Sequence, residues 1–410
     1  MLRNRVQLGC FLLLTLIATA SAFAQKTPDY EALRRQLVND VLIPAGIKHK
    51  GVLKSMLDTP RHEFCQPASR KFAYDDVGLP IGDKQTISSP FIVAYMTESL
   101  DPQPTDKVLE IGTGSGFQAA ILSPLVKEVY SIEIVETLGK NAARLLEKLR
   151  YKNIHTKVGD GFQGWIEHAP FDKIIVTCSP EKPPQPLIDQ LKEGGLMVIP
   201  AGERFNQMLY LMTKKEGKLV PRELRPTLFV PMTGRAEETR EKLPDPAKPE
   251  IGNGDFEAAV EAEKNFIPGG WYYERGQEIV QDSSAPQGKQ YLRFTNQVQG
   301  RWTHVLQGFP VDGKKIAALD LSMQAMCKEV VMGREPKESP MLAITFYNEN
   351  VQEISTSHLG ELKGTLPWKR YESTVKVPPT ARSAIMRIGM FGATGETSFD
   401  DISMRVVPRK

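Results

Sequence analysis

The chain has 410 residues, which is too long for one ordinary domain and predicts at least two. Its hydrophobic fraction of 41% and charged fraction of 25% are those of a soluble globular protein. Acidic and basic residues are mixed along the chain and the formal net charge is only +3, which argues against a nucleic-acid-binding protein, so we expect no nucleic-acid partner.

Residues 1–24 have the three parts of a secretory signal peptide. Arg3 and Arg5 precede an apolar run over 11–17, and small residues follow at Ala22 and Ala24. We predict cleavage near Ala24 and export to the periplasm or cell envelope. The alternative is an uncleaved membrane anchor, because the uncharged stretch is about long enough to span a bilayer when tilted. If the segment is not used, the protein stays in the cytoplasm.

Three cysteines remain after this segment, at positions 65, 178 and 327. They are scattered, so they form neither a disulfide framework nor a metal-ligand spacing. Cys178 ends an apolar run and is expected to be a small buried residue.

Residues 25–236 are predicted to form an α/β domain. Its first part, residues 29–58, has the apolar spacing of helices. From residue 107 onward, short apolar runs alternate with longer amphipathic ones, which predicts a doubly wound, mostly parallel sheet of the Rossmann-like kind. The predicted strands are 107–111, 129–134, 154–158, 171–177, 196–199 and 208–212, and the predicted helices are 116–126, 136–149 and 186–192.

The pattern changes after residue 236. Residues 237–250 are charged and rich in proline, which predicts an exposed linker. Residues 251–410 contain short β runs with turns and no long helix, which predicts an all-β sandwich. Its predicted strands include 291–294, 317–324, 341–347, 371–377 and 384–390.

A glycine-rich loop follows the first strand of the α/β domain. Gly112, Gly114 and Gly116 flank Ser115 and come directly after Glu110. Glycines let the backbone turn tightly and approach a ligand, although a lone Gly-x-Gly is often only a turn. The spacing is not the Gly-x-Gly-x-x-Gly that cradles a pyrophosphate. It suits S-adenosylmethionine, which has no pyrophosphate, and predicts a methyltransferase.

Two acids follow the next two strands. Glu133 ends the second strand, where a carboxylate can accept both hydroxyls of a ribose, and Asp160-Gly161 follows the third, where an adenine would lie. An ordinary strand-end acid in solvent is the alternative for Glu133. All three positions fall at the carboxyl ends of strands, where open α/β sheets bind ligands.

Seven short motifs follow one another between residues 30 and 236: Ala73–Asp76, Leu79–Gly82, Gln85–Pro90, Val108–Ala120, Asp160-Gly161, Gly194-Gly195 and Phe229–Gly234. Together they resemble the protein-L-isoaspartate O-methyltransferase family, and the Thr-Ile-Ser-x-Pro element separates that family from other methyltransferases. Ser89 and Phe117 depart from the Gln and Tyr common in the family. Neither departure removes a reacting group.

The resemblance implies repair of aged proteins. The family methylates the side carboxylate of L-isoaspartyl residues, with D-aspartyl residues as a further candidate substrate here, and the ester then closes to a succinimide that opens partly to normal aspartate. The matching serine, Ser88, would orient the carboxylate; a helix N-cap before Pro90 is its alternative role. Gln85, Thr86 and Ile87 would form the adjacent wall, and Thr233 would approach the cofactor or the substrate backbone.

Two other functions compete with this one. A methyltransferase of small molecules, or of another protein carboxylate, is disfavoured by the Thr-Ile-Ser-Ser-Pro run. An exported glycan- or envelope-binding protein with an inactive methyltransferase half is disfavoured by the intact glycines, Glu133, Asp160 and Ser88.

The β domain resembles the jelly-roll sandwiches of carbohydrate-binding modules. That resemblance implies a structural calcium near the two ends of the domain, for which Asp255, Glu257 and Asp401 could supply oxygen ligands; ordinary turn acids are an equal alternative. Six aromatic residues could stack on sugar rings or belong to the core: Trp271, Tyr272, Tyr273, Trp302, Tyr347 and Trp368. A glycan or an envelope component is therefore a candidate ligand of this domain.

Overall fold

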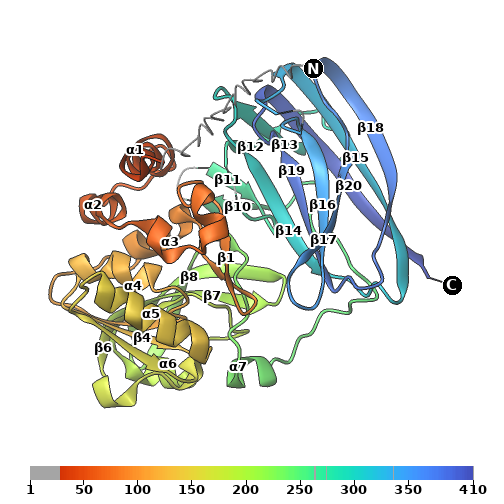
Figure 1. The fold of residues 1–410 in the computed structure, drawn as a ribbon. Helices are drawn as coiled ribbons and strands as arrows, with labels where there is room; N and C mark the ends of the chain where they lie inside the picture. Colours follow the sequence, from red (N-terminus) through yellow and green to blue (C-terminus); the bar gives the residue numbers. More distant parts are fainter. Residues whose placement is uncertain (1–27, 263–264, 274, 336, 410) are drawn as a thin grey trace, which may run out of the picture.

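The computed structural model describes residues 28–262, 265–273, 275–335 and 337–409. An α/β domain and a β-sandwich lie side by side, and an extended segment after the short helix α7 (Arg235–Glu238) leads from the first to the second (Figure 1). The predicted signal peptide lies outside the described residues. Within them, no helix combines the length and the apolar character needed to cross a membrane.

The α/β domain contains a seven-stranded sheet in the order β5-β4-β3-β6-β7-β8-β9. β3 to β7 run parallel, and β8 and β9 extend the sheet as antiparallel strands. This arrangement confirms the predicted mostly parallel sheet. The strands are β3 (Lys107–Ile111), β4 (Glu128–Glu133), β5 (Ile154–Val158), β6 (Phe171–Val176), β7 (Leu191–Glu203), β8 (Asn206–Lys215) and β9 (Lys218–Thr227).

Short helices pack on this sheet and connect its strands. They are α3 (Pro90–Ser99), α4 (Phe117–Leu122), α5 (Glu136–Lys148) and α6 (Gln185–Gln190). α4 is shorter than predicted because Pro124 cannot continue an α-helix, and residues 123–125 form one turn of 3-10 helix instead. β3 lies in the middle of the sheet, and its last four residues are buried, as expected for a strand covered on both faces.

The residues before β3 form a cap of helices and one hairpin. α1 (Tyr30–Gln36) continues as a π-helix over Leu37–Leu42, and α2 (Lys50–Asp58) follows. β1 (Leu79–Gly82) and β2 (Gln85–Ile87) pair as an antiparallel hairpin. Its turn residues Asp83 and Lys84 both have positive φ, as in a type I′ hairpin turn. This hairpin brings the motif of residues 85–90 over the sheet.

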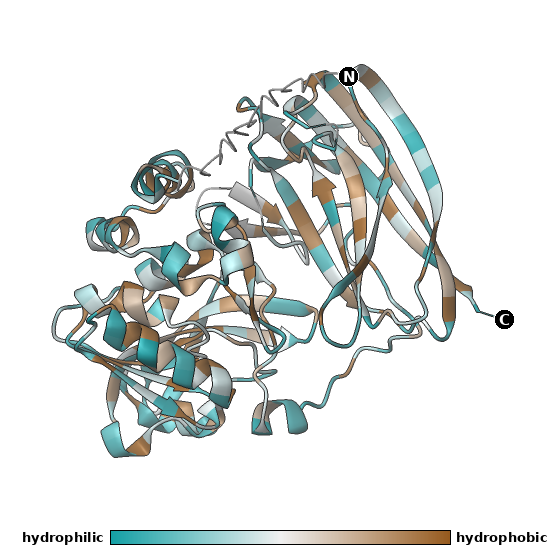
Figure 2. Ribbon diagram, in the orientation of Figure 1, coloured by the Kyte–Doolittle hydropathy of each residue, from teal (hydrophilic) through white to brown (hydrophobic). Residues whose placement is uncertain are grey.

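The second domain packs a five-stranded sheet against a four-stranded one, in the orders β12-β13-β20-β15-β18 and β14-β19-β16-β17. One buried cluster, which includes Phe294, Phe346 and Phe399, joins the two sheets. The edge strand β18 is exposed along most of its length and largely hydrophilic (Figure 2), which discourages pairing with another chain. The strands are β12 (Gln277–Gln281), β13 (Gln290–Asn296), β14 (His304–Pro310), β15 (Ile316–Val331), β16 (Met341–Tyr347), β17 (Glu353–Leu359), β18 (Gly364–Lys376), β19 (Ser383–Gly389) and β20 (Thr394–Pro408); β10 (Ala259–Ala262) and β11 (Asn265–Pro268) form a separate hairpin.

The expectation of an exposed linker is wrong at Arg240. Its side chain is buried, and its guanidinium donates to the carbonyl oxygens of Ser179 (2.9 Å) and Gly202 (3.0 Å) and to the carboxylate of Glu237 (2.8 Å). These acceptors give the buried cation the partners that it needs. The start of the linker is therefore fastened to the α/β domain.

Candidate active site

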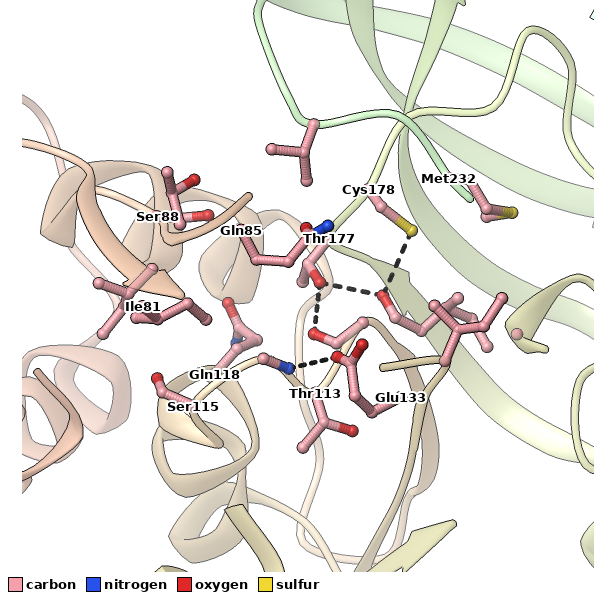
Figure 3. Close-up of a pocket in the computed structure, with 18 of the residues that line it drawn as sticks. Ile81, Gln85, Ser88, Thr113, Ser115, Gln118, Glu133, Thr177, Cys178 and Met232 are labelled. Atoms are coloured by element: carbon pink, nitrogen blue, oxygen red, sulfur yellow. Dashed lines mark hydrogen bonds between the residues drawn. The ribbon is translucent and has the colours of Figure 1, made fainter. Parts of the chain in front are cut away.

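A cavity of about 820 Å³ opens at the carboxyl ends of β3, β4 and β6 (Figure 3). Four segments contribute most of its walls: the hairpin strand β2 with Ser88, the loop after β3, the ends of β4 and β6, and residues 230–233. Predicted site residues that line it are Gln85, Thr86, Ile87, Ser88, Gly112, Gly114, Ser115, Glu133, Gly161 and Thr233.

The glycine loop forms the floor of this cavity. Gly112, Gly114 and Gly116 all have positive φ, at 99°, 53° and 89°, so the chain reverses within a few residues of β3. A Cβ atom at Gly112 would lie 2.5 Å from Oγ1 of Thr177, which itself donates to the carbonyl oxygens of Ile111 and Gly112. The loop therefore lies against the end of β6, and a side chain at Gly112 would not fit.

Glu133 holds the loop from the neighbouring strand. One carboxylate oxygen accepts from the backbone N–H of Gly114 at 2.7 Å, and the other accepts from the N–H of Val135 at 2.9 Å. Burial raises the pKa of Glu133, while these N–H groups act in the opposite direction. Each oxygen has a further lone pair, so the carboxylate can also accept hydrogen bonds from hydroxyl groups of a ligand in the cavity.

Three residues of the predicted cofactor set do not line the cavity. Glu110 is fully buried behind the loop, where it accepts from the hydroxyl of Ser131, and burial raises its pKa to about 8. Gly116 packs against Leu146, whose Cγ and Cδ1 atoms would lie 3.2 Å from a Cβ atom at this position. Asp160 accepts from the backbone N–H groups of Phe162 (2.9 Å) and Arg235 (3.1 Å). The structure thus gives Glu110, Gly116 and Asp160 supporting positions around the cavity.

Ser88 lies between the end of β2 and the start of α3. The N-cap of α3 is Ser89, not Ser88, and Ser89 makes no side-chain capping bond. Asp76 supplies the cap instead, because its Oδ1 accepts from the N–H of Phe91 at 2.8 Å. The alternative role of Ser88 as a helix cap is therefore wrong, and its side chain is available to the cavity.

Residues 230–233 form the wall opposite the hairpin. Ser179 donates its N–H to the carbonyl of Val230 at 2.8 Å, and Met232 donates to the carbonyl of Ser179 at 2.9 Å. This pairing fixes Met232 and Thr233 beside the end of β6.

Sequence reasoning missed Thr177, Cys178, Met232 and Gln118 as cavity residues (Figure 3). For Thr177 and Cys178 a signal was present, since both follow a strand that ends at the same edge as β3.

The calcium hypothesis for the second domain is not supported. Glu257 accepts backbone N–H groups of Lys289 and Gln290, and Asp401 pairs with Arg370 at 2.8 Å. Asp255 accepts from the N–H of Glu257. The described part of the chain contains no group of three or more His, Cys, Asp or Glu side chains that could hold a metal ion.

Two of the aromatic residues considered as a sugar platform are buried instead. Trp271 is 0% exposed and donates its indole N–H to the carbonyl of Asn253 at 3.0 Å. Tyr272 is 1% exposed and donates its hydroxyl to the carbonyl of Phe205 in the α/β domain at 2.6 Å. Trp302 is 51% exposed. The aromatic residues that follow β11 therefore face the core and the other domain.

Comparison with known proteins gives a consistent result for the α/β domain. The family model described as protein-L-isoaspartate(D-aspartate) O-methyltransferase matches residues 33–237, which are half of the chain. The protein-L-isoaspartate O-methyltransferase of Gloeobacter violaceus is 48% identical over 198 residues, covering 48% of this chain and 97% of that protein. The enzyme of the same name from Opitutus terrae is 46% identical over 230 residues, covering 56% of this chain and 98% of that protein.

Among solved structures, a protein-L-isoaspartate O-methyltransferase aligns with a TM-score of 0.45 and 25% identity, covering 60% of this chain and 84% of that chain. The family match and the two relatives fall on the domain that contains the cavity, and the relatives are covered almost completely. The chain therefore belongs to the protein-L-isoaspartate(D-aspartate) O-methyltransferase family.

Proposed function

We propose that this protein transfers a methyl group from S-adenosylmethionine to the free carboxylate of L-isoaspartyl residues, and of D-aspartyl residues, in damaged proteins. The observation that carries the proposal is the position of Ser88. It lines the cavity of the glycine loop and also a second cavity of about 570 Å³ beside it. A donor in the first cavity and an acceptor in the second would meet at this hydroxyl.

The residues of the first cavity suit the donor. Glu133 offers carboxylate oxygens to a ribose, the glycine loop leaves room for the amino-acid part, and Ile111, Ile134 and Met232 offer apolar surface to a purine. When bound, S-adenosylmethionine supplies a methyl group on a positively charged sulfur, which is an activated leaving group.

The acceptor needs alignment more than it needs a base. A carboxylate has a pKa near ~4, so it is ionised and nucleophilic at neutral pH. Ser88 would donate a hydrogen bond to one carboxylate oxygen and leave the other directed at the methyl group. Burial raises the pKa of the Cys178 thiol, which keeps this cavity residue protonated and prevents it from competing for the methyl group.

Esterification of the abnormal carboxylate creates a good leaving group next to a backbone amide. The ester closes spontaneously to a succinimide, and hydrolysis of the succinimide returns part of the material to normal aspartate. The biological role that we propose is therefore the first step of protein repair.

The assay that tests this proposal compares an isoaspartyl peptide with its normal aspartyl twin, using methyl-labelled S-adenosylmethionine. We expect labelling of the isoaspartyl peptide alone. We expect Ser88→Ala to lower kcat about 100-fold, because loss of the orienting hydroxyl misplaces the reacting carboxylate. Equal labelling of the two peptides, or no labelling of either, would contradict the proposal.

The matched control is Ser99→Ala. Ser99 is the last residue of α3 and lines neither cavity. This variant should keep the wild-type kcat, and Ser88→Ala should keep the wild-type affinity for S-adenosylhomocysteine, because Ser88 is proposed to contact the acceptor. A weaker affinity in Ser88→Ala would assign the hydroxyl to the donor side.

We also propose that the enzyme is exported, with residues 1–24 as its signal peptide. Long-lived envelope proteins accumulate isoaspartate, so they are suitable substrates, and the donor has to reach them from the cytoplasm. N-terminal sequencing of the mature protein after cell fractionation tests this proposal. A start near residue 25 in the envelope fraction is expected, and an intact Met1 in the cytosol would overturn it.

A further inference from the structure

The second cavity is built by both domains. Thr86, Ser88, Ser89 and residues 226–230 of the α/β domain line one side, and Tyr272, Tyr273 and Arg275 of the second domain line the other. We call this cavity of about 570 Å³ the acceptor chamber. It shares Thr86, Ser88, Thr177 and Val230 with the first cavity, so the two spaces meet at the proposed reaction point.

We infer that Tyr272, Tyr273 and Arg275 form a specificity-determining wall of the acceptor chamber and select the residues that flank the isoaspartate. This inference rests on the proposed function. The three residues lie outside residues 33–237, so the part of the chain that matches the family does not contain them.

Tyr272 fixes this wall in place. Its backbone exchanges two hydrogen bonds with Leu306 of β14, at 2.8 and 2.9 Å, and its hydroxyl donates to the carbonyl of Phe205. β14 approaches closely because Gly308 has no side chain: a Cβ atom there would lie 3.0 Å from Cδ2 of Leu228 and 3.1 Å from Cδ1 of Phe205. The wall is therefore held by direct packing between the two domains.

Arg275 connects the wall to the proposed reaction point. Its Nε and Nη2 atoms lie 2.8 and 2.7 Å from Oδ2 of Asp76, and both side chains are largely buried. Its guanidinium also lies over the ring of Phe91, 3.9 Å from the centroid. The other oxygen of Asp76 accepts from the N–H of Phe91 and so caps α3, which begins directly after Ser88-Ser89. By holding Asp76, Arg275 therefore stabilises the start of this helix. It is a positioning residue for Ser88.

Tyr273 reaches the second of the two serines. Its hydroxyl is next to Ser89, and burial raises the pKa of Tyr273, which keeps the hydroxyl a neutral donor. Across the chamber, Ile92, Leu228 and Phe229 offer apolar surface. Hydroxyl groups beside apolar side chains suit an extended peptide, whose backbone needs hydrogen-bonding partners and whose side chains need contact area.

The test measures kcat and KM of the full-length protein for isoaspartyl peptides that differ only in the residue next to the isoaspartate. We expect Tyr273→Ala to raise KM at least about 10-fold for a peptide with a small neighbour, and less for one with a bulky aromatic neighbour that refills the space. Affinity for S-adenosylhomocysteine should not change. We expect Arg275→Gln to lower kcat more than it raises KM, with partial rescue in Arg275→Lys.

The matched control is Arg301→Ala. Arg301 also bridges the domains, because its Nη2 donates to the carbonyl of Asp40 at 2.9 Å, but it lines neither cavity. It should behave as wild type. If Tyr273→Ala has the same kinetics as Arg301→Ala, or is more active than wild type, the wall does not select the acceptor and the inference is overturned. If Tyr273→Ala does not fold, Tyr273→Phe replaces it, and unchanged KM with both peptides would overturn the inference equally.

Calorimetric titration of the same peptides, with S-adenosylhomocysteine present, separates this inference from the proposed function. If wild type binds the isoaspartyl peptide without methylating it, and Tyr273→Ala weakens that binding while Arg301→Ala does not, the proposed function fails and the chamber assignment stands. If wild type binds no isoaspartyl peptide, both are overturned.

Discussion

Replacement of Glu133 by alanine is expected to weaken the binding of S-adenosylmethionine by at least about 100-fold, because hydrogen bonds to a charged group are worth ~1.5–3 kcal/mol each and the two ribose hydroxyls would each donate one to this carboxylate. The same change frees the glycine loop, since Glu133 is the acceptor for the N–H of Gly114 at 2.7 Å. A glycine loop that is no longer held in place before binding adds to the affinity lost with the ribose hydrogen bonds. Calorimetric titration with S-adenosylhomocysteine measures the effect.

Two variants sharpen this test. Glu133→Gln keeps one carbonyl acceptor and should lose less affinity than Glu133→Ala. Glu136→Ala removes an exposed acid three residues further along, in the first turn of α5, and should bind the cofactor as wild type does. An affinity for S-adenosylhomocysteine that is unaltered in Glu133→Ala would remove the carboxylate from the cofactor site.

The parallel strands β3 to β6 could be predicted from sequence. β3 to β6 are short runs that each contain Val or Ile residues typical of strands, and their predicted and observed bounds agree closely. β9 was missed because Pro221, Pro226 and several charged residues obscure it, which is typical of an edge strand.

β14 was missed for a different reason. Six of its seven residues are buried, including His304 and Gln307, because one face packs in the sandwich and Gly308 on the other face meets the α/β domain. A strand buried on both faces shows no alternation of polar and apolar residues, and no local pattern reveals contact with a distant domain.

The cofactor side of the site was largely predictable because its residues follow parallel strands, and such strands end at one edge. The direction of a side chain within a strand was not. Glu110 immediately precedes Ile111 of the cavity lining, and alternation along the strand turns its carboxylate away, toward Ser131. Tyr273 and Arg275 could not be predicted, since nothing in their own segment indicates that they contact Asp76 or Ser89, about 200 positions earlier.

The burial of Glu110 predicts a stability that falls as the pH rises. An unfolded glutamate loses its proton near 4.5, whereas burial holds the pKa of Glu110 at about 8 in the folded state. Between these pH values the folded protein binds a proton that the unfolded chain has released. The contribution of Glu110 to the free energy of unfolding is therefore complete below the unfolded pKa and is lost as the pH rises through the folded pKa. The full loss is on the order of 5 kcal/mol.

Glu110→Gln cannot ionise and should remove this loss. The melting temperature of the α/β domain in the variant should exceed that of wild type by about 10 °C at an alkaline pH near 9, and the difference should shrink toward about pH 5. The informative quantity is the change of melting temperature with pH, because a pH-independent cost of placing an amide beside Ser131 lowers the melting temperature equally at both pH values. Glu147→Gln, at an exposed position of α5, should keep the wild-type slope. Parallel curves for Glu110→Gln and wild type would mean that the buried carboxyl stays charged, with Ser131, itself hydrogen-bonded to Thr113, as a sufficient partner.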